Sequence, residues 1–338
     1  MSGFPEVPGP EAEEQPEPAA HSAQENHTFN ADDRLVSASA YGDLGPREPQ
    51  IAAVATPFLE GYARQPLLPP VRFPNVGDVG LVVVILLCGW MGSGALFAAA
   101  LHFHLWGIST VKQAVNDIHY TLGSQAIWYL ISFGGCMLLF PAIWGKTFFD
   151  GLEWHAVTAL RRRWLLFTAA FICFLLALAD EVLLPGPQDT PIDHVFRMPG
   201  AAWLLFAFGV TIAPFFEEMA FRGFLLPAFC TAIDWAFERV NKLPQRQPDP
   251  QGNTRWSWGA MAAGSLLTSV PFALMHAYQT GWSVGPFLLL VCVSLVLCWV
   301  RLSLRSLAAS TLVHSSYNFL LFSLMLAGTG GFKHLDKM

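Results

Sequence analysis

Long apolar runs alternate along this chain with short polar or basic segments. Seven of the runs have about the 20 residues that an α-helix needs to cross the hydrocarbon core of a bilayer. They predict an all-α fold, a polytopic transmembrane helix bundle of about seven spans, at residues 79–102, 124–144, 164–184, 201–229, 258–277, 284–304 and 307–326. The first 76 residues lack this pattern and are rich in Pro, Glu, Ala and Gln. Such a segment cannot bury enough apolar surface to offset its chain entropy, so we expect a disordered tail.

Composition supports a membrane protein. The chain has 338 residues, of which 53% are hydrophobic and only 13% are charged, whereas ordinary soluble domains are about 25% charged. The net charge of −6 is uneven, because residues 1–76 contain eleven acidic and four basic side chains, a net of −7, and the remainder carries +1. The acidity therefore belongs to the tail, and nothing in the charge balance of the body predicts a nucleic-acid partner.

Lysine and arginine gather in alternate loops, and this asymmetry sets the expected orientation. The loops after the second, fourth and sixth spans carry most of them: Lys146, Arg161, Arg162, Arg163, Arg239, Lys242, Arg246, Arg255, Arg301 and Arg305. Because cytoplasmic loops are the basic ones, we expect a cytoplasmic N-terminus, an outside C-terminus and a place in the cell (inner) membrane. The chain then divides into a cytoplasmic tail (1–76), two spans with a basic loop (77–163) and a core (164–328).

Three charged side chains, Glu217, Glu218 and Arg222, lie inside the fourth apolar run. A charge at the centre of a span costs roughly 2.5–3.5 kcal/mol on insertion scales, so such groups persist only where they face protein or water. Glu218 and Arg222 are four residues apart and can pair on one helix face, whereas Glu217 points about 100° away. This spacing predicts that one glutamate is held and the other is available for chemistry. A purely structural ion pair between spans is the alternative.

Two later runs also carry polar side chains. His276 lies near the end of the fifth run, and His314 and Asn318 are four residues apart in the seventh. Each alone is typical of an interfacial histidine or of hydrogen bonds between spans. Together with the glutamates they are the groups needed to activate water and to bind an oxyanion, and equally the groups that ligate zinc. The chain contains no HExxH zinc motif.

A shared site requires the three runs to bring these groups to one depth. The run boundaries place Glu217 and His314 near the middle of the membrane but His276 near its outer end. We therefore expect either that the fifth span continues past Tyr278, or that the fourth and seventh spans are tilted and irregular.

The three clusters resemble the signatures of the CPBP family of intramembrane proteases, which includes the CAAX prenyl endopeptidase Rce1 and the bacterial Abi-type proteins. The family motifs are EExxxR, FxxxH and HxxxN or HxxxD. They stand here in the same order as Glu217-Glu218-Met219-Ala220-Phe221-Arg222, Phe272-Ala273-Leu274-Met275-His276 and His314-Ser315-Ser316-Tyr317-Asn318. The resemblance covers about residues 165–326 and adds little to the first two spans and the tail.

The resemblance implies an all-helical membrane endopeptidase. By the matched motifs, Glu217 looks like the general base that activates water, with His276 assisting, and His314 and Asn318 look like the oxyanion-stabilising pair. Glu218 and Arg222 look like supporting residues that orient the site. We expect no essential metal, with zinc on Glu217, Glu218, His276 and His314 as the alternative. The implied partners are the lipid bilayer and a membrane-associated protein or peptide substrate, which the sequence does not identify.

Two other functions fit parts of this pattern. Buried Glu and His side chains can relay protons in a proton-coupled transporter, but that class predicts inverted repeats and broken helices at matching places, which we do not find. A non-catalytic membrane scaffold or bacteriocin-immunity protein would keep the fold after losing the chemistry. All motif positions are intact here, which favours the protease.

Overall fold

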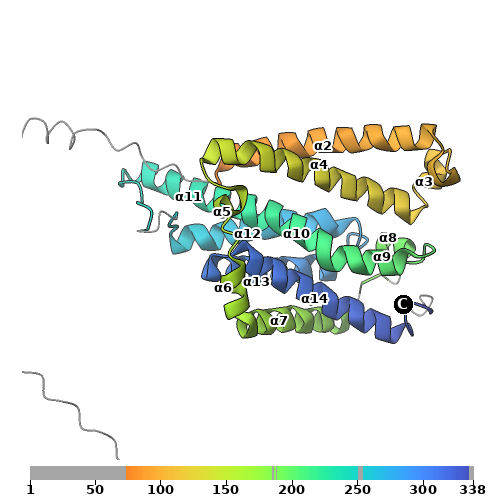
Figure 1. Cartoon of the computed structure of the whole chain (residues 1–338). Helices are drawn as coiled ribbons and strands as arrows, with labels where there is room; N and C mark the ends of the chain where they lie inside the picture. Colours follow the sequence, from red (N-terminus) through yellow and green to blue (C-terminus); the bar gives the residue numbers. More distant parts are fainter. Residues whose placement is uncertain (1–73, 185, 188, 250–253, 335–338) are drawn as a thin grey trace, which may run out of the picture. The chain divides into compact units, whose positions relative to one another are not determined.

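The predicted apolar runs all form long helices in the computed structural model, which describes residues 74–184, 186–187, 189–249 and 254–334. These helices are α2 (Val76–His102), α4 (Ile118–Trp144), α7 (Arg163–Leu183), the stretch α9–α11 (Ala201–Val240), α12 (Trp258–Ala277), α13 (Val284–Leu304) and α14 (Leu307–Gly328) (Figure 1). No strand occurs in this described part of the chain, so the all-α prediction is confirmed. The predicted disordered tail, residues 1–76, lies outside the described residues except for its last three.

Short helices connect the long ones. They are η2 (Leu105–Gly107), α3 (Val111–Ala114), α5 (Phe148–Gly151), α6 (Ala156–Arg161) and α8 (Pro191–Phe196). Several begin with a side chain that accepts hydrogen bonds from the first free backbone N–H groups, as Thr110 does for α3 and Thr147 does for α5. Each of these two caps satisfies one of the backbone donors that the start of a helix leaves free.

Six of the long helices have the length and apolar composition to cross a membrane, which identifies an integral membrane protein. Six of the about seven predicted spans are therefore identified within the described residues, and the seventh, α14, does not meet this standard. Its central turns carry Thr311, His314, Ser315, Ser316 and Asn318, which lower its mean hydropathy. Thr311 and His314 are buried against other helices, so the polarity of these two side chains faces protein. The orientation and the particular membrane stay predictions.

The fourth helical stretch is longer than the predicted run, since it ends at Val240 and not at residue 229. It consists of α9 (Ala201–Ala207), η3 (Phe208–Ile212), α10 (Ala213–Glu218), η4 (Met219–Leu225) and α11 (Leu226–Val240), of which η3 and η4 are π-helical. At 1.5 Å per residue its 40 residues extend about 60 Å, twice the thickness of the hydrocarbon core. The middle of the predicted run therefore does not fix the depth of Glu217.

Helix α12 runs antiparallel to α11. At its start, the Ser257 hydroxyl and backbone N–H donate to the Asp234 carboxylate at 2.6 and 2.8 Å. Further along, Gly264 packs on Cys230 so closely that a Cβ there would lie 2.7 Å from the sulfur. This pairing brings His276, at the far end of α12, level with Glu217. Helix α12 ends at Ala277, so the conflict over depth is resolved by the long, irregular fourth stretch and not by an extended fifth span.

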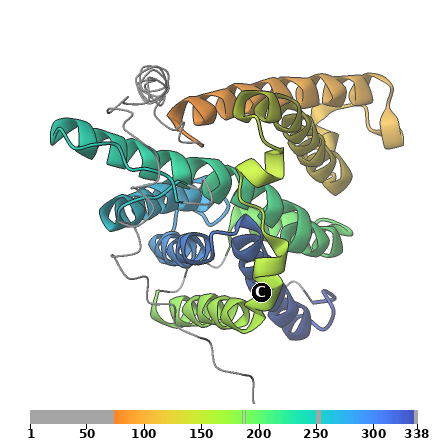
Figure 2. The same cartoon turned by 60° about the vertical axis from the view of Figure 1, so that its left-hand side comes forward.

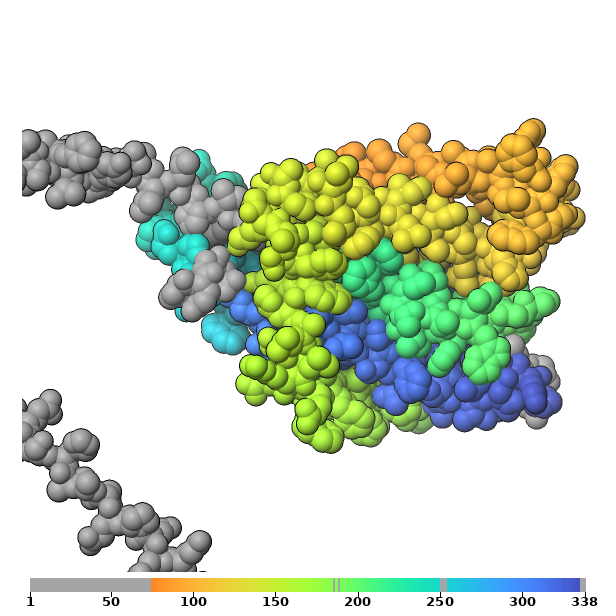
Figure 3. Space-filling model, in the orientation of Figure 1, coloured from red at the N-terminus to blue at the C-terminus, as the bar shows by residue number. Residues whose placement is uncertain are grey.

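Two apolar clusters flank the α10–η4 segment. One is formed by α2, α4, α5 and η4 around Phe140, Phe148 and Phe224, and the other by α7, α13 and α14 around Leu297 and Val313. The views in Figures 1 and 2 agree that α2 and α4 lie on one side of α10–α11, with α13, α14 and α7 on the other. Figure 3 shows α4, the α9–α10 segment and α14 side by side on one face.

A partly buried charge cluster connects the α13–α14 turn to the loop between α5 and α6. The Glu153 carboxylate accepts hydrogen bonds from Arg301 Nη1 at 2.8 Å and Arg305 Nη2 at 2.7 Å, and its backbone oxygen accepts from Leu307 N–H at 3.0 Å. Burial alone would raise the pKa of Glu153, but the two guanidinium groups outweigh it and hold that pKa below its ordinary value. This cluster fixes where α14 begins, and α14 carries His314.

We predict that Glu153→Gln destabilises the protein by about 3 kcal/mol at neutral pH, because it leaves the buried Arg301 guanidinium without its counter-charge and removes one of the two acidic partners of the half-buried Arg305. The lowered pKa means that the carboxylate stabilises the fold above the ordinary glutamate pKa and loses this effect as pH falls through the folded-state value. Thermal unfolding in detergent should therefore show a gap between wild type and variant that narrows on acidification. Exposed Glu181→Gln is the control. Equal unfolding temperatures at neutral pH would contradict the prediction.

Candidate active site

The two glutamates lie on α10, between the π-helical segments. Pro214 has no N–H, so it cannot bond to the carbonyl groups of the preceding turn, and η3 occupies that turn. Pro227 follows η4 in the same way. The Gly209 carbonyl in η3 accepts a hydrogen bond from Asn318 Nδ2 at 2.8 Å. The local sequence thus places Glu217 and Glu218 on a short helical turn whose flanks are irregular, a setting that is frequent at functional sites.

Glu218 is the centre of a fully buried network. Its Oε1 accepts a hydrogen bond from Arg222 Nη1 at 2.9 Å and lies 3.1 Å from His314 Nδ1. Both Glu218 and Arg222 are 0% exposed. The predicted ion pair between residues four apart is therefore present, and it extends to α14 through His314.

Helix α13 contributes Ser294 to this network. Arg222 Nη2 donates to the hydroxyl of Ser294 at 2.7 Å and to its carbonyl at 3.3 Å. The guanidinium carbon lies 4.4 Å from the centre of the Phe272 ring on α12. These contacts satisfy several donors of the arginine and hold it against an aromatic face, so the guanidinium stays beside Glu218 as its counter-charge. Sequence reasoning missed Ser294, because a single serine in an apolar run gives no signal of its own.

Glu217 lies between the two histidines. Its Oε1 is 3.9 Å from His276 Nε2, and its Oε2 is 3.7 Å from His314 Nε2. His276 Nδ1 is 3.0 Å from the Phe272 carbonyl, one turn earlier on α12. A carbonyl can only accept, so Nδ1 carries the proton and Nε2 turns toward the glutamate. The Glu217 side chain is 12% exposed, in contrast to Glu218.

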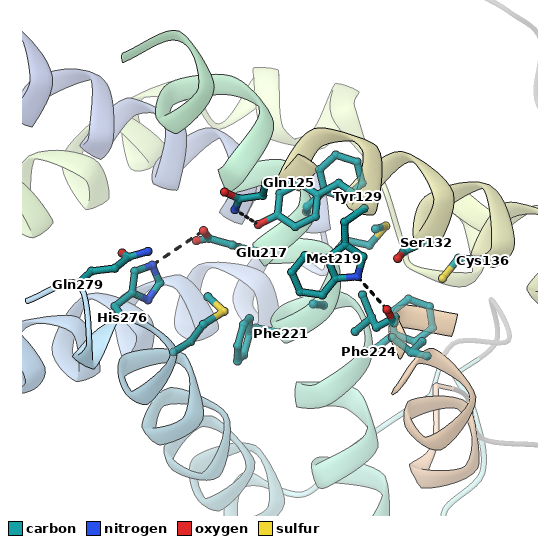
Figure 4. A pocket seen from close by; sticks show the side chains of 16 residues that line it. Gln125, Tyr129, Ser132, Cys136, Glu217, Met219, Phe221, Phe224, His276 and Gln279 are labelled. Atoms are coloured by element: carbon teal, nitrogen blue, oxygen red, sulfur yellow. Dashed lines mark hydrogen bonds and ion pairs between the residues drawn. The ribbon is translucent and has the colours of Figure 1, made fainter. Parts of the chain in front are cut away.

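A cavity of about 330 Å³ opens beside Glu217 (Figure 4). His276 and Gln279 line it from the end of α12, and Gln125 and Tyr129 line it from α4. The remaining lining is mostly apolar: Val82, Leu86, Trp128, Ser132, Cys136, Phe216, Met219, Ala220, Phe221, Phe224 and Met275. The site therefore joins the Glu217–His276 pair to a largely apolar chamber.

The structure brings five of the six predicted residues into direct contact: Glu217, Glu218, Arg222, His276 and His314. The sixth, Asn318, lies one turn beyond His314 and bonds to Gly209. Neither His314 nor Asn318 lines the cavity. Sequence reasoning missed the α4 side, because none of the three motifs lies in the second span. Gln125, Tyr129 and Ser132 recur there at helical spacing, and this signal could have found that face.

Zinc ligation by Glu217, Glu218, His276 and His314 was the alternative left open by the sequence. Within the described ranges, no group of three or more His, Cys, Asp or Glu side chains is arranged to hold a metal ion. The two histidines approach different oxygens of Glu217, so the carboxylate lies between the rings and does not share a common centre with them. Glu218 is occupied by the guanidinium of Arg222. These residues do not fit a zinc site.

Fold and site together define an all-α integral membrane protein with a buried glutamate–histidine centre. Residues 199–320 match the family model described as type II CAAX prenyl endopeptidase Rce1-like. The matched range contains all three motifs, and the match confirms the resemblance that they suggested. Comparisons with curated proteins and with solved structures found no match.

Proposed function

We propose that this chain is an intramembrane endopeptidase that hydrolyses a peptide bond of a membrane-associated substrate. The observation that carries the proposal is the position of Glu217: a carboxylate at the edge of a cavity, with a histidine ring within 4 Å of each oxygen. Its neighbour Glu218 is also a carboxylate, but it is fully buried and paired with Arg222. The two glutamates thus divide into one reactive and one structural group. The family match supports protease activity.

In the proposed reaction, Glu217 takes a proton from a water molecule as the water oxygen attacks the carbonyl carbon of the scissile peptide. The π electrons of the carbonyl move onto its oxygen, which becomes an oxyanion. When this intermediate collapses, the C–N bond breaks and the leaving nitrogen receives the proton that Glu217 holds. His276, anchored through Nδ1, presents Nε2 to the same carboxylate and can assist this transfer.

The supporting groups act through position and charge. Arg222 neutralises Glu218, so that two adjacent carboxylates do not repel each other in a medium of low dielectric constant. His314 links both glutamates, because its two ring nitrogens face Glu218 and Glu217. The oxyanion role that the resemblance gives to His314 and Asn318 stays a prediction.

The substrate we propose is a prenylated CaaX protein or peptide. Its support is the largely apolar lining of the cavity beside Glu217, which suits a lipid chain or apolar side chains and would not solvate a charged segment. The matched family of type II CAAX prenyl endopeptidases points to the same class of substrate.

We predict that the purified protein in liposomes cleaves a farnesylated CaaX peptide once, at an internal bond, and that a chelator leaves the rate within about twofold, since the residues do not form a metal site. Mass spectrometry of the products gives the bond, and the same peptide without farnesyl shows whether the lipid is recognised. A rate that falls with the chelator and returns with zinc would overturn the metal-free mechanism. Absence of any cleavage would overturn the proposed function.

A further inference from the structure

Helix α4 contributes a polar wall to the cavity that the three motifs do not account for. Gln125 and Tyr129 are one turn apart on α4 and both line the cavity with Glu217. Figure 4 shows the Tyr129 hydroxyl and the Glu217 carboxylate directed to the same part of the cavity. The Tyr129 ring is held in place, since it stacks on Phe216 at 4.6 Å and on Phe208 at 6.1 Å between centroids. A phenol fixed in this way is preorganised.

The hydrogen bonds around Tyr129 leave its hydroxyl group free to donate a proton but already use it as an acceptor. Gln125 Nε2 donates to the Tyr129 oxygen at 2.9 Å, so the oxygen already accepts. Within the described residues, the hydroxyl proton has no protein acceptor, and the group lines the cavity. A tyrosine hydroxyl both donates and accepts, so the free half of this group is a donor directed at whatever occupies the cavity.

The other candidate donors to an oxyanion are engaged elsewhere. Asn318 bonds to the Gly209 carbonyl, and His314 lies between the two glutamates. Neither borders the cavity, whereas Tyr129 does. A substrate carbonyl placed in the cavity for attack by a water on Glu217 would therefore meet the phenol on its α4 side.

We propose that Tyr129 is a catalytic residue that donates a hydrogen bond to the scissile carbonyl oxygen as it becomes an oxyanion, and that Gln125 is the positioning residue that orients the phenol. This inference rests on the proposed hydrolytic function. It assigns the second span a direct part in the reaction.

The test is Tyr129→Phe, which removes the hydroxyl and keeps the stacked ring. Loss of one oxyanion donor lowers kcat by about 10²–10³-fold. We expect that drop in the liposome assay, with KM nearly unchanged and with an equal loss of affinity for a statine-type peptide that mimics the tetrahedral intermediate. Tyr317→Phe is the matched control, because Tyr317 is buried in the α7–α13–α14 cluster and does not line the cavity.

A second variant, Gln125→Met, should lower kcat by between about tenfold and 10²-fold, because the phenol of Tyr129 loses the hydrogen bond that orients it.

The possible outcomes distinguish a failure of the role proposed for Tyr129 from a failure of the proposed hydrolytic function. Wild-type cleavage with an unchanged Tyr129→Phe rate overturns this inference and leaves the proposed function in place. If Tyr129→Phe raises KM and leaves kcat unchanged, the inference is also overturned, because Tyr129 would then contribute to substrate binding in the ground state and not to the transition state. Absence of cleavage by the wild type overturns the proposed function, and the role of Tyr129 with it.

Discussion

Replacing Glu217 by glutamine is expected to lower kcat for peptide cleavage by about 10²–10⁴-fold, the usual contribution of a general base. Glutamine keeps the size of the side chain but cannot take a proton from water. Because Glu217 is partly exposed to the cavity and makes no short salt bridge, the fold should tolerate the change. The measurement is the rate of product formation in liposomes, with thermal unfolding recorded on the same preparation.

Glu181→Gln is the control for this experiment, since Glu181 is an exposed carboxylate at the end of α7 and lies outside the cavity. Its rate should equal that of the wild type. If Glu217→Gln also cleaved at the wild-type rate while remaining folded, Glu217 would have no part in the mechanism. A proton-flux assay with the same two variants would show whether the carboxylate instead serves transport, the alternative for buried ionisable groups in a membrane.

The second large effect concerns stability. Arg222→Met should destabilise the protein by about 3–5 kcal/mol, because removal of one partner leaves the Glu218 carboxylate buried without its counter-charge. Methionine keeps an apolar contact with Phe272, so the loss reports mainly the charge and the bonds to Glu218 and Ser294. Thermal or denaturant unfolding in detergent measures the change. Arg239→Met, an exposed arginine on α11, is the matched control and should unfold like the wild type.

A double variant tests the physical reason. When Arg222→Met is combined with Glu218→Gln, the uncompensated charge disappears and part of the lost stability should return. A double variant that is less stable than Arg222→Met alone would show that packing of the guanidinium, and not charge, dominates. Activity should stay low in the double variant, because His314 loses the anion that faces its Nδ1.

The sequence predicted the elements whose signals are local. Apolar length alone located all seven long helices, and the spacing of Glu218 and Arg222 alone predicted their ion pair. The sequence also predicted that the three motifs share one site, because ionisable side chains inside a membrane protein face the bundle interior and pair with one another. The seventh predicted span, α14, is the one that does not meet the apolar standard of the other six, because the same polar residues that build the site lower its hydropathy.

Features that depend on packing could not be read from the chain. The length of the fourth stretch was underestimated, because α11 continues with polar side chains such as Asp234 and Glu238 that are buried against neighbouring segments. The π-helical segments depend on Pro214 and Pro227 within a continuous helix, where proline is normally taken as a break. The contribution of α4 needed the tertiary structure, since only that places Tyr129 beside Glu217.

The most direct test of the central claim, hydrolysis of a peptide bond by water activated at Glu217, is cleavage of a farnesylated CaaX peptide in ¹⁸O-labelled water. The wild type should give a product whose new carboxylate carries one ¹⁸O atom, and Glu217→Gln should give at least about 10²-fold less of it in the same time. Equal amounts of labelled product from wild type and folded Glu217→Gln, or no labelled product from the wild type, would contradict the account.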